Sequence, residues 1–361
     1  MKILFYGHVL GLGLGHYARS VRLAEAALEV GFEAVVTSGG RAGALVPRRP
    51  EVGVLELSEA SLGDVSDPAW QARERTLLAY CREARPDVVV VDALPFGARG
   101  ELAGVLLAAQ EEGWSTRLFW GLPYSKAVEG PVRNPRLRRA MAGYTGVLAY
   151  AERDWMDPFP DYAAFGLPGV AEHVGMVTAA VAPAEGPPVL LCVIGSGRVS
   201  DDVVLQSFVA SAGPLAEARG LGLRFVAGPM ADMDRLAGLA RGCDRLDLVQ
   251  ACSVEEAARD AAVVVSRVGY NSAFTLARTD IPLVLAPATL AEQTRRASLL
   301  AELDGIWTCP QDALESRLPA LLEAALARGR TPRSLPFRVD GAQRAARRFR
   351  AAAVQMGGVK G

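Results

Sequence analysis

His16 lies in a glycine-rich turn, where a side chain that takes up protons is accessible to a substrate. The stretch GHVLGLGLGHYARS covers residues 7–20 and follows the apolar strand expected at residues 2–6. The chain is amphipathic from Tyr17 onward, so a helix is predicted to begin beside His16. Its imidazole would then project from a strand-to-helix turn, which is the position of a general base. The alternative is a histidine that caps its own helix. His8 is interpreted as structural.

A general base needs a partner that orients it, and Asp92 has the right place for this role. The sequence DVVVVDALPFG puts Asp92 at the carboxyl end of an apolar run that indicates a buried strand, where an unpaired carboxylate is costly. Paired with the distal nitrogen of His16, Asp92 would fix the tautomer of the ring and stabilise the imidazolium. The alternative is an aspartate that caps the next turn.

Arg19 lies one helical turn beyond His16. It is predicted to share the face of His16 and to point towards a bound diphosphate or an acceptor, or else to form a surface ion pair.

The glycines of this turn do not form a dinucleotide fingerprint, which needs G-x-G-x-x-G and an acidic residue at the end of the next strand. Gly11, Gly13 and Gly15 come as G-x-G-x-G, and His16 replaces the third glycine. The next strand ends at residues 37–40 as TSGG, without a carboxylate. A nicotinamide cofactor is therefore not expected, and no other cofactor is predicted.

A second group of residues has the chemistry to bind an anion. The sequence VVVSRVGYNSAFTLA predicts a strand that runs into Arg267, a turn at Gly269 and a helix with Asn271 and Ser272 among its first residues. Backbone N–H groups, the helix dipole and the Ser272 hydroxyl make such a helix start suited to a diphosphate, and Arg267 adds charge-assisted hydrogen bonds.

These residues are predicted to be positioned by two α/β domains. Short apolar runs alternate with amphipathic ones, first over residues 2–120 and again from residue 189, which is typical of a doubly wound parallel sheet. The boundaries expected are an N-terminal acceptor-binding domain at 1–180, a donor-binding domain at 187–335, and a helix at 336–361 that crosses back to the first domain. A ligand is expected at the carboxyl ends of both sets of strands, in a cleft that the domains face.

Composition narrows the class of protein. The formal net charge is -1 over 361 residues, which lacks the basic excess typical of nucleic-acid binding. The five cysteines are widely spaced and predict neither a disulfide framework nor a zinc ribbon. No leader sequence and no membrane span are expected, so the protein is predicted to be cytoplasmic.

The D-x-D at residues 232–234 is interpreted as a solvated turn, and no catalytic metal is predicted. The arginines of RNPRLRRA, residues 133–140, are expected to form a solvated helix face, with peripheral contact to an anionic acceptor or lipid head-group as the alternative.

The motifs in both halves resemble one family. GYNS within SRVGYNSAFTLA resembles the G-W-N-S of the nucleotide-sugar signature of GT-B glycosyltransferases. GLGLGHYARS resembles the G-x-G-H-x-x-R loop of bacterial predicted glycosyltransferases and of the sugar-nucleotide hydrolase of pseudaminic acid synthesis. The general plan is similar to that of the lipid-intermediate N-acetylglucosaminyltransferase of cell-wall synthesis. The resemblance implies the GT-B fold, in which two Rossmann-like domains face across a cleft.

The resemblance also implies further donor contacts. IGSG matches the first glycine turn of the family's second domain, which approaches the donor diphosphate closely. VQACSVEEA occupies the region that holds the nucleoside in relatives. The residues implied are Gly15, Arg19, Gly195, Ser196, Gly197, Arg267, Gly269, Asn271 and Ser272 for the diphosphate, Val249, Gln250 and Thr275 for the nucleoside, and Glu292 and Gln293 for the sugar.

Thr275 departs from the pattern of relatives that use UDP-sugars, which usually carry glutamate there to hold both ribose hydroxyls. Threonine at this place resembles antibiotic glycosyltransferases that use dTDP-sugars, and so favours a dTDP donor. The alternative is a donor site that is altered or lost.

The sequence therefore predicts an inverting, metal-independent glycosyltransferase that moves a sugar from a dTDP- or UDP-sugar to a hydroxyl of a small-molecule acceptor, in secondary metabolism. Two alternatives stay open: a sugar-nucleotide hydrolase in which His16 activates water, and a non-catalytic sugar-nucleotide-binding relative. The sequence leaves the acceptor and the oligomeric state undetermined.

Overall fold

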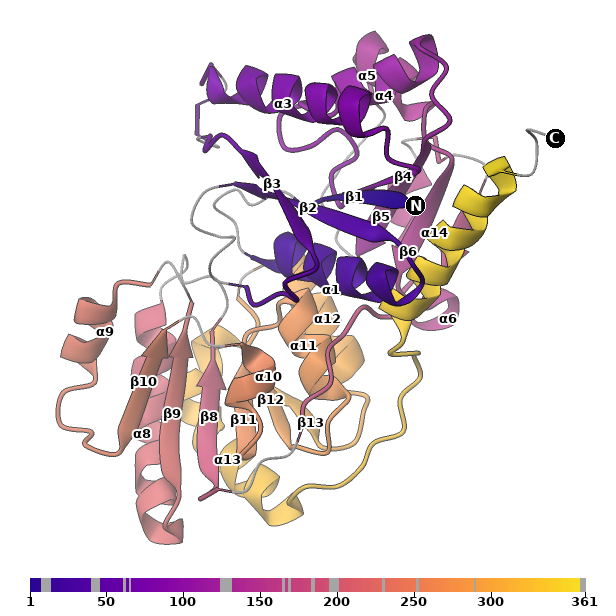
Figure 1. The fold of residues 1–361 in the computed structure, drawn as a ribbon. Helices are drawn as coiled ribbons and strands as arrows, with labels where there is room; N and C mark the ends of the chain where they lie inside the picture. The colour runs from indigo at the N-terminus through magenta and orange to yellow at the C-terminus, as the bar shows by residue number, and fades with distance from the viewer. Residues whose placement is uncertain are drawn as a thin grey trace. The chain divides into compact units, whose positions relative to one another are not determined.

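A computed structural model describes residues 1–7, 14–39, 46–60, 63–64, 66–123, 132–163, 166–167, 170–182, 186–194, 201–228, 231–250, 253–288 and 290–357. The chain divides into two compact units (Figure 1). Unit 1 combines Met1–Thr178 with Pro336–Gly361, and unit 2 is Ala179–Leu335.

Unit 1 contains a seven-stranded sheet in the order β3-β2-β1-β4-β5-β6-β7, and its neighbouring strands pair in parallel. The β4 strand reads VVVVD and is buried at every position, as expected of a parallel strand covered on both faces. The strands are β1 (Lys2–Tyr6), β2 (Glu33–Gly39), β3 (Gly53–Leu57), β4 (Val88–Asp92), β5 (Arg117–Pro123), β6 (Gly146–Tyr150) and β7 (Ala171–His173).

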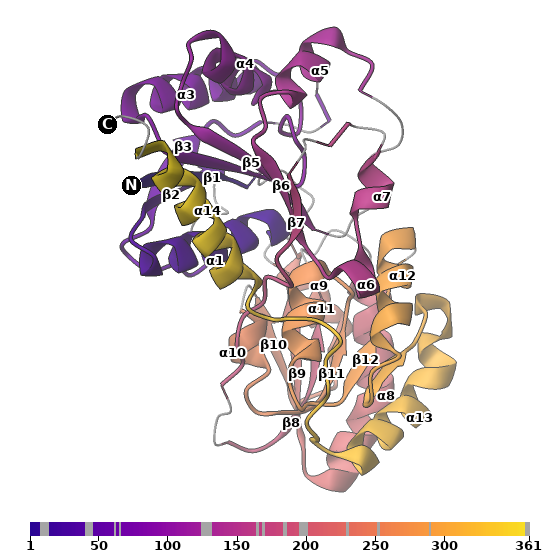
Figure 2. The same ribbon diagram turned by 90° about the vertical axis from the view of Figure 1, so that its right-hand side faces the viewer.

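The helices of unit 1 cover both faces of this sheet (Figure 2). On one face, α1 and α14 pack together, and the ring of Phe349 in α14 lies 6.0 Å from Phe5 and 5.2 Å from Phe119. On the other face, α3, α4 and α5 share a core that includes Leu77 and Leu106. The helices are α1 (Gly15–Glu29), α3 (Ala69–Ala84), α4 (Ala103–Glu111), α5 (Pro135–Met141), α6 (Arg153–Met156), α7 (Phe159–Tyr162) and α14 (Gly341–Gly357).

Unit 2 contains a six-stranded parallel sheet in the order β10-β9-β8-β11-β12-β13. Its strands are β8 (Val189–Val193), β9 (Gly222–Ala227), β10 (Leu246–Gln250), β11 (Ala261–Ser266), β12 (Leu283–Leu285) and β13 (Ile306–Thr308). Residues of α8 and α13 form one core with the sheet, among them Phe208 and Leu318. The helices are α8 (Asp201–Arg219), α9 (Met233–Leu239), α10 (Val254–Ala257), α11 (Tyr270–Ala277), α12 (Ala291–Leu300), η2 (Gln311–Ala313) and α13 (Leu314–Arg328).

Each sheet has one switch point, where two neighbouring strands lead to helices and strands on opposite sides of the sheet. In unit 1 the strands progress from β1 to β3 on one side and from β4 to β7 on the other, so β1 and β4 are neighbours. In unit 2, β8 and β11 are neighbours for the same reason. Open α/β sheets bind ligands outside the carboxyl ends of the strands at such a switch point. The architecture therefore indicates one candidate site in each unit.

Candidate functional site

The switch point of unit 1 brings together the two residues predicted to form a catalytic pair. His16 is the second residue of α1 and Asp92 is the last residue of β4. Since β1 pairs with β4 and Tyr6 lies opposite Val91, the start of α1 lies beside the carboxyl end of β4. The His16 Nδ1 and Asp92 Oδ1 atoms are 2.8 Å apart. The structure thus brings the two side chains within hydrogen-bonding distance.

Arg19 is the third member of this group. Its Nε donates to Asp92 Oδ2 at 2.7 Å and its Nη2 donates to Asp92 Oδ1 at 2.5 Å. The same Nη2 lies 2.9 Å from His16 Nδ1. The side chains of Arg19 and Asp92 are 2% and 1% exposed, whereas that of His16 is 31% exposed. The sequence predicts that Arg19 points towards a diphosphate, but the structure directs it to Asp92, because a buried carboxylate needs a cation beside it.

The charge of Asp92 is fixed by these neighbours. Burial has the largest effect and would by itself raise the pKa of Asp92. The Arg19 charge and the hydrogen bonds from His16 and Arg19 together outweigh burial, so the pKa is lowered from 3.8 to about 2. An anion at Nδ1 favours a proton on that nitrogen, which makes Nε2 the basic nitrogen of His16.

The turn that follows Asp92 is strained. Ala93 has φ of 66°, in the left-handed region that costs L-residues about 1–2 kcal/mol. Trp120 Nε1 donates to the Ala93 carbonyl at 2.9 Å, and the Ala93 amide donates to the Gly121 carbonyl at 2.9 Å. The Leu94 amide closes the turn on the Asp92 carbonyl at 3.0 Å. The sequence does not reveal this turn, because alanine rarely adopts positive φ, and it gives no signal that Trp120 supports the site.

Gly7 allows α1 to approach β1 closely. A Cβ at Gly7 would lie 2.9 Å from the His16 carbonyl oxygen and in steric overlap with the Ser20 hydroxyl. Gly15 is the first residue of α1, directly before His16. The two earlier glycines of the turn, Gly11 and Gly13, lie outside the described residues, as does His8.

A second buried charged group lies on the opposite face of the sheet. The Tyr6 hydroxyl donates to Glu101 Oε1, and Arg73 Nε lies 3.9 Å from the same oxygen. Glu101 also accepts from the amides of Ala98 and Arg99, at 3.2 and 2.8 Å. Burial, together with the Glu101 charge, raises the pKa of Tyr6. This group fixes the loop that follows Asp92. Its members are far apart in the chain, so no local sequence pattern indicates it.

At the switch point of unit 2, Arg267 is held among three strand ends. Its amide donates to the carbonyl of Val193, the last residue of β8, at 3.1 Å. Its guanidinium, in a residue that is 7% exposed, donates to Gln311 Oε1 at 3.0 Å and to the Ala286 carbonyl at 3.5 Å. Arg267 therefore places positive charge where the sequence predicts a diphosphate.

The start of α11 lies directly after Arg267. Gly269 is the N-cap residue, with φ of -65° and ψ of 143°, and no described side chain caps the helix. A Cβ at Gly269 would meet no atom within 4 Å. Asn271 and Ser272 occupy the second and third positions and are half-buried. Amides in the first turn of a helix have no partner within that helix, which makes them donors for an anion.

The first turn of α12 contains the two residues predicted to contact the sugar, Glu292 and Gln293. Gln293 Oε1 accepts from the Ala288 amide at 2.9 Å and so shapes the chain between β12 and α12. One turn later, Arg296 is 2% exposed and donates to the Val268 carbonyl. Arg296 thereby joins α12 to the turn before α11, and no sequence pattern indicates this contact.

Val249 and Gln250 end β10, which is the edge strand of the sheet and is separated from β8 by β9. Gln250 Nε2 donates to the Ala231 carbonyl at 3.2 Å. The glycine turn predicted at Gly195, Ser196 and Gly197 lies outside the described residues.

Thr275 does not have the environment expected of a nucleoside contact. It is 0% exposed, and its hydroxyl accepts from the Ala179 amide at 3.3 Å. Thr275 lies on the sixth position of an eight-residue helix whose buried face packs into unit 2. Thr275 therefore has a packing role in this structure, and the preference for dTDP inferred from it stays a prediction.

The D-x-D sequence has a local structural role. The Asp232 side chain caps α9 by accepting from the Arg235 amide at 3.1 Å. Within the described residues, no group of three or more His, Cys, Asp or Glu side chains is arranged to hold a metal ion. Among the helices that the structure describes, none is both long and apolar enough to cross a bilayer.

The arginines of residues 133–140 form ion pairs with neighbouring helices. Arg136 Nη2 lies 2.8 Å from Glu74 and Arg139 Nη2 lies 2.6 Å from Glu111, and these side chains are partly to fully exposed. The pairs are those expected of a solvated helix face.

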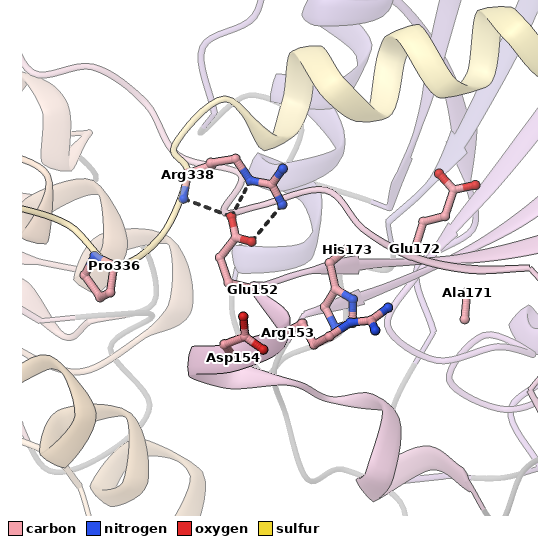
Figure 3. Close-up of a pocket in the computed structure, with 8 residues that line it drawn as sticks. All are labelled: Glu152, Arg153, Asp154, Ala171, Glu172, His173, Pro336 and Arg338. Atoms are coloured by element: carbon pink, nitrogen blue, oxygen red, sulfur yellow. Dashed lines mark hydrogen bonds and ion pairs between the residues drawn. The ribbon is translucent and has the colours of Figure 1, made fainter.

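A charged hollow of about 500 Å³ lies at the β7 edge of the unit 1 sheet (Figure 3). Arg338 binds both oxygens of Glu152, at 2.6 and 2.7 Å, and Figure 3 shows this pair between the segment before α14 and the start of α6. His173 Nε2 lies 2.8 Å from Asp157 Oδ1. Because these charges neutralise each other and β7 is the edge strand, the hollow is a weaker candidate than the β1–β4 switch point.

Comparison with known proteins bears on the fold. No protein-family model matches the sequence, and no curated protein matches it. Solved structures do match. The glycosyltransferase SnogD from Streptomyces nogalater is 17% identical, with a TM-score of 0.60 over 99% of this chain and 95% of that one. The glycosyltransferase VinC in complex with dTDP is 14% identical, with a TM-score of 0.58 over 99% and 96%. The UDP-GlcNAc 2-epimerase from Methanocaldococcus jannaschii is 11% identical, with a TM-score of 0.64 over 97% and 100%.

The chain has the GT-B fold. The two parallel sheets and the near-full coverage of glycosyltransferase structures confirm the fold class and the resemblance that the sequence predicts. The GT-B fold is shared by transferases and epimerases among these structures, so the reaction depends on the residues at the two switch points and not on the fold.

Proposed function

We propose that the protein is an inverting, metal-independent glycosyltransferase that moves a sugar from a dTDP- or UDP-sugar to a hydroxyl of a small-molecule acceptor, in the cytoplasm and in secondary metabolism. The observation that carries the proposal is the His16–Asp92 pair at the β1–β4 switch point, 2.8 Å apart. The partly exposed imidazole can meet an acceptor, and the buried carboxylate keeps the ring oriented.

In the proposed reaction, Nε2 of His16 takes the proton of the acceptor hydroxyl as its oxygen attacks the anomeric carbon. The bond from that carbon to the diphosphate oxygen breaks, and the nucleoside diphosphate leaves with the electron pair. Attack on the face opposite the leaving group inverts the anomeric configuration. General-base assistance of this kind contributes about 10²–10⁴-fold to the rate.

The leaving group is assigned to unit 2. Arg267 and the first amides of α11, with Asn271 and Ser272, supply positive charge and donors for a diphosphate at the β8–β11 switch point. These groups would stabilise the charge of the diphosphate in place of a metal ion. Arg267 would exchange its contact with Gln311 for the diphosphate when the donor binds. The dTDP bound to VinC supports a dTDP donor here.

A sugar-nucleotide hydrolase is the second candidate. It is favoured by the exposure of the His16 side chain, which is 31% exposed, since the same base would then activate water instead of an acceptor. The two candidates share the donor site and differ in the product, which is a glycoside in one case and a free sugar in the other.

The test is thermal stabilisation by dTDP, UDP, GDP and ADP, each with magnesium and with EDTA. A nucleotide at a hundred times its dissociation constant stabilises the folded state by about 2.7 kcal/mol. We expect a shift with dTDP or UDP that does not need magnesium and that Arg267→Gln abolishes. Arg241→Gln, which changes an exposed arginine after α9, is the matched control and should leave the shift intact. The absence of a shift with every nucleotide would overturn both candidates.

A further inference from the structure

The guanidinium of Arg19 bonds Asp92 inside the protein instead of pointing towards a ligand. Its guanidinium is 2% exposed and bonds both carboxylate oxygens of Asp92, at 2.7 and 2.5 Å. Parallel bonds of this kind hold the carboxylate in one plane, since the guanidinium is a rigid fork. Asp92 therefore has a fixed orientation, with Oδ1 facing His16.

Arg19 lies beside three neighbouring strands, β4, β5 and β6. Asp92 ends β4 and lies opposite Gly121 of β5, and Tyr150 ends β6. The guanidinium carbon of Arg19 lies 5.6 Å from the centre of the Tyr150 ring, which is within cation–π range. A Cβ at Gly121 would lie 2.6 Å from Tyr150 Cζ, so only glycine leaves room for that ring.

Three polar atoms that lie close together determine which ring nitrogen of His16 carries the proton. Asp92 Oδ1, His16 Nδ1 and Arg19 Nη2 form a triangle with sides of 2.8, 2.9 and 2.5 Å. With a proton on Nδ1, both nitrogens donate to Oδ1. With the proton on Nε2, the lone pair of Nδ1 could accept from Arg19 Nη2 at 2.9 Å, but it would also face the charged Oδ1 atom of Asp92 at 2.8 Å. With the proton on Nδ1, only the 2.9 Å contact is lost, since Nη2 keeps its shorter bond to Oδ1 at 2.5 Å. The triangle therefore favours the tautomer that has its lone pair on Nε2.

We propose that Arg19 is a positioning residue that holds the Asp92 carboxylate so that His16 carries its proton on Nδ1 and presents Nε2 as the base. The use of Nε2 as the base rests on the proposed function, whereas the assignment of the proton to Nδ1 does not. Lysine cannot replace arginine in this role, since its single ammonium group has no two-pronged geometry. Without the fork, the carboxylate is free to turn and both ring tautomers become populated.

The experiment is nitrogen-15 NMR of the full-length protein at about pH 9, where imidazoles are normally neutral. The chain has three histidines, and the His16 signals are those missing from the His16→Gln spectrum. We expect the wild type to show a protonated Nδ1 and a bare Nε2. Arg19→Lys, which keeps the charge, should shift both signals towards the average of the two tautomers, and Asp92→Asn should favour the proton on Nε2.

Arg82→Lys is the matched control. Arg82 also bonds one carboxylate through Nε and Nη2, that of Glu112, but lies exposed on α3. This variant should leave the His16 signals unchanged.

A folded Arg19→Lys protein with an unchanged Nδ1 proton would overturn the proposal. Gly121→Ala gives an independent test that keeps Arg19, since displacing the Tyr150 ring should move the same signals; an unchanged spectrum would also contradict it. Nucleotide binding is measured separately, so the tautomer assignment stands or falls without the proposed function.

Discussion

Removing the negative charge of Asp92 should change how the stability of unit 1 depends on pH. The pKa of Asp92 is lowered from 3.8 to about 2 in the folded protein. A carboxylate with a depressed folded-state pKa contributes fully above pH 3.8 and loses its contribution as the pH falls towards 2. The shift corresponds to about 2 kcal/mol of the free energy of unfolding, at 1.36 kcal/mol for each pKa unit.

Asp92→Asn is the perturbation that isolates this contribution. At neutral pH we expect it to destabilise the protein by about 3–5 kcal/mol, because Arg19 is left buried without its anion. As the pH falls from about 5 to about 2, the wild type should lose about 2 kcal/mol relative to the variant. The double variant Arg19→Met with Asp92→Asn should be less destabilised than the sum of the single variants, since it removes both charges.

The assay is urea unfolding followed by tryptophan fluorescence in a Trp307→Phe background. Of the five tryptophans, the other four lie in unit 1, so the signal then reports that unit alone. Parallel pH profiles for the wild type and Asp92→Asn would refute the reasoning, because they would show that Arg19 and His16 do not hold Asp92 ionised.

Three further predictions follow from close packing and burial. Gly7→Ala should destabilise unit 1 by about 1–3 kcal/mol through overlap with α1, whereas Gly238→Ala, in open space on α9, should be neutral or stabilising; equal melting temperatures would contradict this. Thr275→Val should lower the stability of unit 2 by about 1–3 kcal/mol through the lost acceptor, and isothermal titration should find nucleotide affinity unchanged; a tenfold weaker affinity would restore Thr275 as a nucleoside contact. Burial raises the pKa of Cys81 to about 12, so Cys81→Ser should leave the number of thiols that react with Ellman's reagent at about pH 8 unchanged.

The sequence was sufficient for the fold and for the pairing of His16 with Asp92 because both depend on local patterns. The VVVVD strand predicts a buried parallel strand with a carboxylate at its end, and the glycine turn before His16 predicts the start of α1. The fold class is confirmed by the two parallel sheets and by the GT-B structures. The roles of the predicted site residues stay predictions.

Other features depend on distances that local pattern does not contain. Arg19 has the spacing of a residue that points to a ligand, but the sequence does not show that Asp92 takes both its donors. Thr275 was interpreted from its place in a motif, and the helix then turned it into the core. Ala93 gives no sign of a left-handed backbone, and the Tyr6–Glu101 contact joins residues 95 positions apart.

The most direct test of the central claim is nucleoside diphosphate release from dTDP- and UDP-sugars by the wild type and by His16→Gln, with a panel of phenolic and sugar acceptors and with EDTA present. Binding of the free nucleotide is measured in the same samples. We predict that His16→Gln keeps its nucleotide affinity and loses about 10²-fold or more of the release rate. A variant that releases the diphosphate as fast as the wild type would contradict the assignment of His16 as the base.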